Sequence, residues 1–343
     1  MKSIRVSLMF ICIRVPLMSR LEEEEEEREM FDLNTLLNPP ADLTVASIIV
    51  ISYILGLMHG ITPDEHTWPI TFSYSVGSYS TRGGIKSGFV FSLGFTAQRA
   101  LLTTLGFLGL AAVYRMYNLD GPVYILVGVA MFIAGSYILK GKYIHLPIDA
   151  LLRGKEHHST GAERVPLHEA HIEPVPLKMA AVHGIIAGWG FGAFATIITF
   201  VLAPQMPSLI YAPLPGLFFG LGTMSMQIIL GGLFANIMRV MKLTVEQIKY
   251  LGRTTAARTL YYGGMAFTVI GALVTALPAL DEYAITTGNP IPNLNSIGVS
   301  FVLVIGVVGF IGIGSMVKGF RQITKSNVNS GKKERQRDQS VIE

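Results

Sequence analysis

The chain has 343 residues, of which 50% are hydrophobic and only 15% are charged, and its formal net charge is +4. A soluble globular domain carries about 25% charged residues, so this composition excludes an ordinary soluble domain and favours a membrane protein. The single cysteine, Cys12, excludes a disulfide framework within the chain and a transmembrane dithiol electron carrier. The positive charges lie in loops and tails, where they indicate membrane topology and not a nucleic-acid surface.

Residues 1–42 are predicted to form an acidic N-terminal tail. Its apolar stretch is short, is interrupted by Arg14 and lacks a small-residue cleavage site, which makes it a poor signal peptide. An unbroken glutamate run at residues 22–27 repels itself and stays solvated. We therefore expect disorder in this tail and leave it out of the fold prediction.

Seven apolar segments follow, and each is long enough to cross the hydrocarbon core. They cover residues 43–62, 85–113, 121–141, 177–204, 209–238, 256–280 and 296–317. Lipid offers no hydrogen-bond partner to a free backbone, so these segments should be helices. The predicted fold is an all-α polytopic membrane protein with about seven transmembrane helices. Residues 67–80 would fit either a cytoplasmic loop or a re-entrant segment.

Lysine and arginine residues distinguish the two sides of the membrane. With the N-terminal tail excluded, alternate loops carry 20 of these residues on one side and one on the other. The positive-inside rule therefore predicts a multi-pass protein of the plasma or inner membrane, with its N-terminus outside and its C-terminus in the cytoplasm.

Two stretches of the chain resemble each other. GFVFSLGF at residues 88–95 matches GLFFGLGT at residues 216–223, an offset of 128 residues. One span earlier, His59-Gly60 pairs with His183-Gly184 at an offset of 124 residues. Two features that recur in the same order predict an internal repeat.

The repeat divides the chain into two halves of three spans, residues 43–141 and 177–280. An odd number of spans inverts the second half across the membrane, and such inverted repeats are frequent in secondary transporters, whose sites lie between the halves. Residues 142–176 form a cytoplasmic loop between the halves. A loop and a final helix at 281–317 and a basic cytoplasmic tail at 318–343 complete the chain.

The densest group of ionisable residues closes the first span. His59, Asp64, Glu65 and His66 fall within eight residues, and ionisable groups at membrane depth are functional candidates by default. Pro63 kinks or ends the helix, so Asp64 and His66 can turn back toward His59. Two imidazoles and a carboxylate suit nickel, cobalt or zinc, and the lack of thiolates disfavours copper(I). The alternative is a helix end that enters a solvated loop and binds nothing.

The segment HGITPDEHTWPITFSYSVGSYSTRGGIKSGFVFSLGFT, residues 59–96, resembles the core of the nickel/cobalt permease superfamily, of the transporter and efflux-permease types. His59 and Asp64 keep the His-x4-Asp spacing of that superfamily. His66 comes one residue late, because Glu65 is inserted.

The next helix carries the resemblance further. Phe91-Ser92-Leu93-Gly94 reads F-x-L-G, as in the superfamily, and Arg82 occupies the basic turn before it. The chain departs at Phe95, where the importers carry a histidine, and at Ser225 and Gln227, which stand where aspartates are expected. These departures leave the identity of the substrate open.

The resemblance implies a divalent-metal permease that transports nickel or cobalt and holds no cofactor permanently. We predict His59, Asp64 and His66 as metal ligands. The repeat adds His183 as a fourth ligand from the inverted half, with a hydrogen-bonded packing histidine as the alternative.

Arg99 lies inside the second span, next to Gln98, and an arginine there must face protein or water. We expect it to act with Gln98 as a gate or charge partner, pairing with Asp64 or Glu65. The alternatives are binding of an anionic substrate and a structural role with backbone carbonyls.

The loop at residues 142–176 is rich in histidine. His157, His158, His168 and His171 could bind metal weakly as an accessory site. The alternative is a plain polar linker, and the prolines of this loop argue against a folded domain.

Three functions remain open: a divalent-metal permease, an exporter of organic or sulfur oxyanions that uses Arg99, and an accessory protein that supplies metal to a metalloenzyme. We predict no enzymatic activity, because H-E-x-x-H and related spacings are absent. The sequence also lacks a G-x-x-x-x-G-K-[ST] loop, so energy would come from a gradient or a partner ATPase. The expected partners are a divalent metal ion and the lipid bilayer, without nucleic acid; a homo-oligomer is compatible with the sequence.

Overall fold

The structure is a computed structural model that describes residues 32–140, 175–237, 241 and 243–325. The N-terminal tail, the loop between the halves and the C-terminal end lie outside the described residues. The predictions for His157, His158, His168 and His171 fall on that loop.

The first predicted span is a broken helix. After the short α2 (Leu33–Leu37), α3 (Val45–Ile61) begins at Thr44, whose hydroxyl accepts a hydrogen bond from the Ser47 amide. Pro63 follows the end of α3, and the chain becomes helical again as α4 (Trp68–Val76), which has Pro69 in its first turn. Nearly all of α4 is buried, so this segment is neither a solvated loop nor the end of the span.

The first span of the second half is also broken. α9 (Leu177–Ala187) stops at the sequence Gly-Trp-Gly-Phe-Gly, residues 188–192. The chain continues as α10 (Ala193–Thr196), the π-helical η1 (Ile197–Leu202) and the 3-10 turn η2 (Ala203–Gln205). Three glycines within five residues explain the interruption, because glycine is costly in a helix interior.

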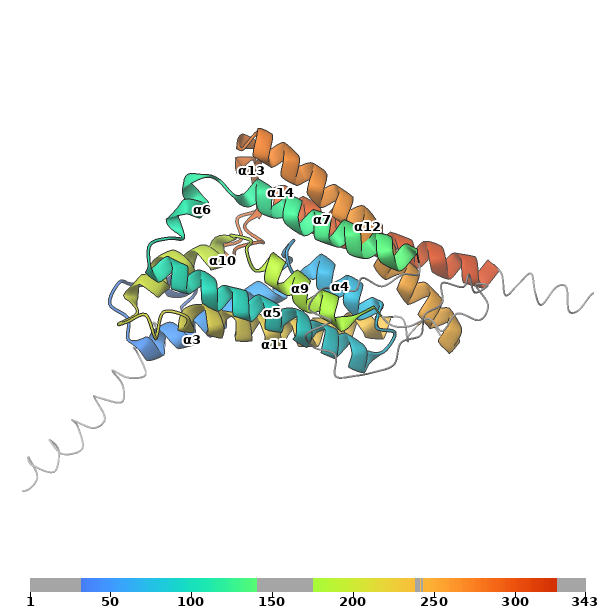
Figure 1. The fold of residues 1–343 in the computed structure, drawn as a ribbon, viewed down its shortest axis with the longest axis horizontal. Helices are drawn as coiled ribbons and strands as arrows, with labels where there is room; N and C mark the ends of the chain where they lie inside the picture. The colour runs from blue at the N-terminus through green and yellow to red at the C-terminus, as the bar shows by residue number, and fades with distance from the viewer. Residues whose placement is uncertain (1–31, 141–174, 238–240, 242, 326–343) are drawn as a thin grey trace, which may run out of the picture.

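Long helices surround the two broken ones (Figure 1). They are α5 (Thr81–Phe107), α7 (Asp120–Leu139), α11 (Leu214–Ile237) and α12 (Val245–Ala276). The last helix consists of α14 (Val299–Val304) and the π-helical η4 (Ile305–Ile313) and runs to Lys325. The remaining elements are short: α6 (Ala112–Met116), α13 (Ala279–Glu282) and the antiparallel strands β1 (Ile285–Thr286) and β2 (Ser296–Ile297).

Within the described residues, four helices are long and apolar enough to cross a membrane, namely residues 120–139, 214–237, 245–276 and 299–325. The described chain is thus that of an all-α membrane protein, although the seven predicted spans are not confirmed. The first and fourth predicted spans fall on broken helices, whose pieces are too short to cross alone. α5 has 27 residues but is less apolar, with Gln98 and Arg99 in its interior.

The two broken helices run in opposite directions. In Figure 1, α3 and α10 lie toward one end of the molecule, and α4 and α9 lie toward the other. α3 contacts α10, and α4 contacts α9. The two breaks therefore lie between these ends, in the interior of the helical bundle.

Glycines let these helices approach closely, and their contacts repeat. A Cβ added to Gly184 of α9 would collide with the Phe91 carbonyl of α5, and one added to Gly56 of α3 would collide with the Phe219 carbonyl of α11. Both members of the second contact differ from those of the first by 128 residues. This is the offset of GFVFSLGF and GLFFGLGT. It pairs Gly184 with Gly56 and not with Gly60, so the predicted His59–His183 correspondence is displaced by about one helical turn.

A candidate metal centre at the helix break

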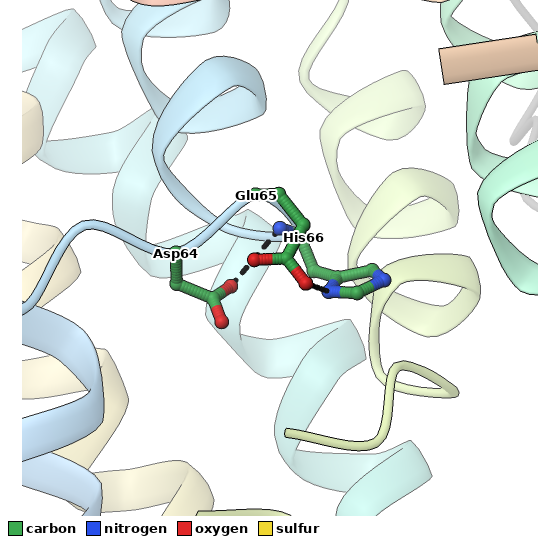
Figure 2. A group of neighbouring side chains, drawn as sticks. All are labelled: Asp64, Glu65 and His66. Carbon is green, nitrogen blue, oxygen red and sulfur yellow. Dashed lines mark hydrogen bonds and ion pairs between the residues drawn. The ribbon is translucent and has the colours of Figure 1, made fainter. Parts of the chain in front are cut away.

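Three adjacent side chains form a buried group in the break between α3 and α4. Each of Asp64, Glu65 and His66 offers one ligand atom, and these atoms lie within 4.8 Å of one another. Figure 2 shows that the Glu65 carboxylate turns toward the His66 ring. All three residues are at most 5% exposed, so the alternative of a solvated helix end is wrong.

Asp64 shapes the break. Its Oδ1 accepts a hydrogen bond from the His66 amide at 3.0 Å, and its carbonyl accepts one from the Trp68 amide at 3.0 Å as α4 begins (Figure 2). This local turn is of the kind that aspartate favours where a helix starts. The other carboxylate oxygen, Oδ2, lies 3.7 Å from Nδ1 of His59.

Glu65 joins the break to two other helices. Its Oε1 lies 3.0 Å from Nδ1 of His66 and accepts a hydrogen bond from the Tyr124 hydroxyl of α7 at 3.3 Å. The Tyr124 hydroxyl also lies 3.0 Å from the Ser300 hydroxyl of α14. Glu65 is therefore held in place as a member of the cluster and is not a mere insertion.

His66 connects the two breaks. Its ring stacks on Tyr124 with centroids 5.4 Å apart, and the other contact of the ring is Gly190 in the second break, where a Cβ would collide with it. Among the described residues, Nε2 of His66 is buried without a hydrogen-bond partner. That nitrogen is free to bind a ligand.

His59 approaches the group from the end of α3. Its ring lies among Phe95, Phe194 and Phe219, with centroid distances of 5.7, 5.9 and 5.1 Å. Its Nε2 is likewise buried without a partner in the described part of the chain. The structure thus brings together His59, Asp64 and His66, as predicted, and adds Glu65.

His183 is not a member of this group. Its Nδ1 lies 2.9 Å from the Tyr74 hydroxyl of α4 and 2.9 Å from the Met179 carbonyl. The predicted fourth ligand thus has the alternative role, that of a hydrogen-bonded packing residue. The one-turn displacement between the 124- and 128-residue offsets explains why it does not face His59.

Arg99 differs from its expected role as an ion-pair partner. It is buried, and its Nη2 donates a hydrogen bond to the Gly190 carbonyl at 2.8 Å. The guanidinium carbon lies 4.7 Å from the ring centre of Phe95 and 5.6 Å from that of Phe219. Across the described residues, no carboxylate oxygen lies within 4.0 Å of the guanidinium, so the expected pair with Asp64 or Glu65 does not form.

Gln98 packs beside the second break as well. A Cβ on Gly188 would collide with its side chain, and its two polar side-chain atoms have no partner among the described residues. Gln98 and Arg99 thus both contact the glycine-rich break, which sequence reasoning had not connected to them. Nothing in the sequence pointed to Gly190, Tyr124 or Ser300.

No protein-family model, curated protein or solved structure matches the chain. The resemblance to the nickel/cobalt permeases therefore stays a prediction.

A further carboxylate outside the spans reports on the negative charge near the site. Burial, and then the carboxylates of Asp120 and Glu65, raise the pKa of Asp281 in α13 to about 6. Because the native pKa lies above its unfolded value, the native state binds more protons than the unfolded chain between about pH 4 and pH 6. The free energy of unfolding should therefore fall as the pH rises through that window.

Asp281→Asn should remove this fall. Because Asp281 is only half-buried, we discount for solvent screening and expect the variant to exceed the wild type by about 1 kcal/mol at pH 7 and to equal it at pH 4. Thermal unfolding in detergent across this pH range measures the difference. Asp42→Asn, at an exposed aspartate before α3, is the matched control and should not change the pH profile. Parallel profiles for Asp281→Asn and the wild type would contradict the prediction.

Proposed function

We propose that this protein is a membrane transporter of divalent transition-metal ions of the nickel/cobalt type. The observation that carries the proposal is the buried group of Asp64, Glu65 and His66 in the helix break, with His59 beside it. The metal ion is the transported substrate and not a resident cofactor.

The donor set favours a borderline divalent metal. Two carboxylates can neutralise a doubly charged ion, which would otherwise be costly to bury away from water. The imidazole nitrogens of His59 and His66 favour nickel, cobalt or zinc over magnesium or calcium, which prefer oxygen ligands alone. These two rings both present an unpartnered Nε2, so the group has nitrogen ligands to offer.

The position of the group favours transport over a purely structural metal site. It lies where two oppositely directed broken helices meet, one from each half, with Gly190 of one break against His66 of the other. Discontinuous helices that meet in the membrane interior are typical of secondary transporters. A gradient or a partner ATPase would then drive the movement of the ion.

One observation favours a second candidate, the oxyanion exporter. Arg99 is a buried cation without a carboxylate in contact, and its Nε and Nη1 lack hydrogen-bond partners within the described residues. An anionic substrate could accept hydrogen bonds from these two groups. The metal proposal has more support, since four further ionisable side chains gather around the first break.

Cellular metal content tests the two candidates. Cells that express the wild type should differ from cells that express Asp64→Asn/Glu65→Gln in accumulated nickel, cobalt or zinc, measured by mass spectrometry, whichever direction transport takes. Asp42→Asn is the matched control and should behave like the wild type. If metal content is the same in all three while Arg99→Leu changes tolerance to sulfur oxyanions, the exporter replaces the permease.

A further inference from the structure

One face of α4 carries hydroxyl groups that bond to nothing among the described residues. Thr71 and Ser75 are four residues apart in the helix, and Thr67 precedes them at the same spacing, so the three lie on one face. All three are completely buried. Ser73, on another face, donates a hydrogen bond to the Pro69 carbonyl at 2.7 Å. The helix can therefore satisfy a buried hydroxyl, yet it leaves this row unbonded.

α11 continues the polar row opposite α4. The Ser75 hydroxyl lies 3.2 Å from the position that a Cβ of Gly231 would take, so that glycine leaves room for it. One turn earlier on α11, Gln227 is fully buried; its Nε2 donates to the Gly60 carbonyl at 3.2 Å, and its Oε1 has no described partner. Gly60 is in the last turn of α3, beside the break. The row thus leads from the break along α4.

Such a row is costly in a helix surrounded by apolar neighbours. A buried hydroxyl without a partner loses its hydrogen bonds to water and gains none in the protein, and valine or alanine would pack there without that loss. Buried polar groups are almost always satisfied, so unbonded ones in one line call for an explanation. Oxygen atoms that contact a passing solute would supply the missing partners.

The second half repeats one element of this row. Thr199 follows Thr71 by 128 residues, the offset of the glycine contacts. It is fully buried in η1, and its hydroxyl also has no partner within the described residues. π-helical turns of this kind are frequent at functional sites. Each broken helix therefore presents a free hydroxyl beyond its break.

We propose that Thr67, Thr71 and Ser75, with Gln227 opposite, line the passage of the divalent cation between the Asp64–Glu65–His66 group and the membrane side where α4 ends. The inference rests on the proposed function. Neutral oxygens can replace part of the hydration shell of the ion without holding it as tightly as carboxylates and imidazoles do, which lets the ion leave. α4 leads toward Arg82 and Lys86, so the predicted topology makes this the cytoplasmic half of the path.

Cysteine accessibility tests the passage in the full-length protein. In a Cys12→Ser background, Thr71→Cys and Ser75→Cys should react with a small charged methanethiosulfonate about tenfold faster than Ser73→Cys, because only a hydrated thiol ionises readily. Ser73→Cys is the matched control, buried in the same helix but off the row. Added nickel should slow the reaction at the two row positions.

The outcomes separate the passage from the proposed function. Equally slow reaction at all three positions, in protein that still binds nickel, overturns the passage alone. Fast reaction at the row positions that nickel, cobalt and zinc leave unchanged overturns the assignment to a metal, and the proposed function with it.

A second variant guards against misfolded cysteine variants. Thr71→Val keeps the shape of the side chain and removes the hydroxyl. If Thr71 lines the passage, the transport rate in proteoliposomes should fall while the nickel Kd of the purified protein stays unchanged. Unaltered transport in this variant would contradict the role of Thr71.

Discussion

Asp64→Asn/Glu65→Gln should abolish measurable binding of nickel, cobalt and zinc to the purified protein. The double change keeps the side-chain shapes and the polar contacts but removes both negative charges from a buried group. A doubly charged ion would then enter an apolar interior beside Arg99 without compensation, so we expect a loss of affinity of about 1000-fold or more, equivalent to about 4 kcal/mol. Calorimetric titration in detergent measures it.

Two controls make this titration specific. The first is a background in which His157, His158, His168 and His171 are all alanine, so that any accessory binding by the loop is removed. The second is Glu282→Gln, which neutralises an exposed carboxylate of α13 and should leave the affinity unchanged. Equal affinities in the double variant and in Glu282→Gln would show that the ion, if bound, lies elsewhere.

The structure also changes the expected ranking of single variants. From spacing alone, Asp64→Ala should weaken binding more than Glu65→Ala, because Glu65 was read as an insertion. In the structure both carboxylates belong to the same group of ligand atoms. Asp64→Asn and Glu65→Gln should therefore each weaken binding substantially, and the same titration compares them.

Gly184→Ala should destabilise the protein by about 3 kcal/mol, the upper part of the range for inserting atoms into a packed interior. The new Cβ would overlap the Phe91 carbonyl, and a backbone atom in α5 cannot move away as a flexible side chain could. The two helices must then separate along their contact. Unfolding in detergent, followed by heat or denaturant, measures the loss.

The repeat supplies a second variant and η4 a control. Gly56→Ala meets the Phe219 carbonyl in the corresponding contact and should lose a similar amount of stability. Gly306 has no heavy atom within 4 Å of an added Cβ, so Gly306→Ala should be neutral or raise stability by up to about 1 kcal/mol. Similar stabilities for all three variants would contradict the close approach of these helices.

Much of the local organisation was readable without the structure. Long uncharged segments predicted an all-α membrane protein, since only self-satisfied helices are stable in lipid. Pro63, which cannot donate to the α3 ladder, predicted an interruption at the ionisable cluster. The similarity of residues 88–95 and 216–223 gave the offset that the helix contacts follow. These features depend on neighbouring residues, and so a sequence expresses them directly.

The partners of each functional side chain depend on packing between distant helices. The His-Gly pairs at residues 59 and 183 look equivalent in sequence, yet the glycine contacts pair Gly184 with Gly56, and this one-turn difference places His183 against Tyr74. For the same reason Arg99 meets the Gly190 carbonyl and not a carboxylate.

Tertiary structure alone decided which residues complete the cluster. Glu65 belongs to it because Tyr124, 59 residues away, donates to its carboxylate, and His66 keeps its orientation because the second break presents a glycine to its ring. The sequence specified which chemical groups lie near the break, since chain connectivity keeps them adjacent. Which of them face one another follows from the register of helix packing, and that register is set by close glycine contacts between segments more than a hundred residues apart.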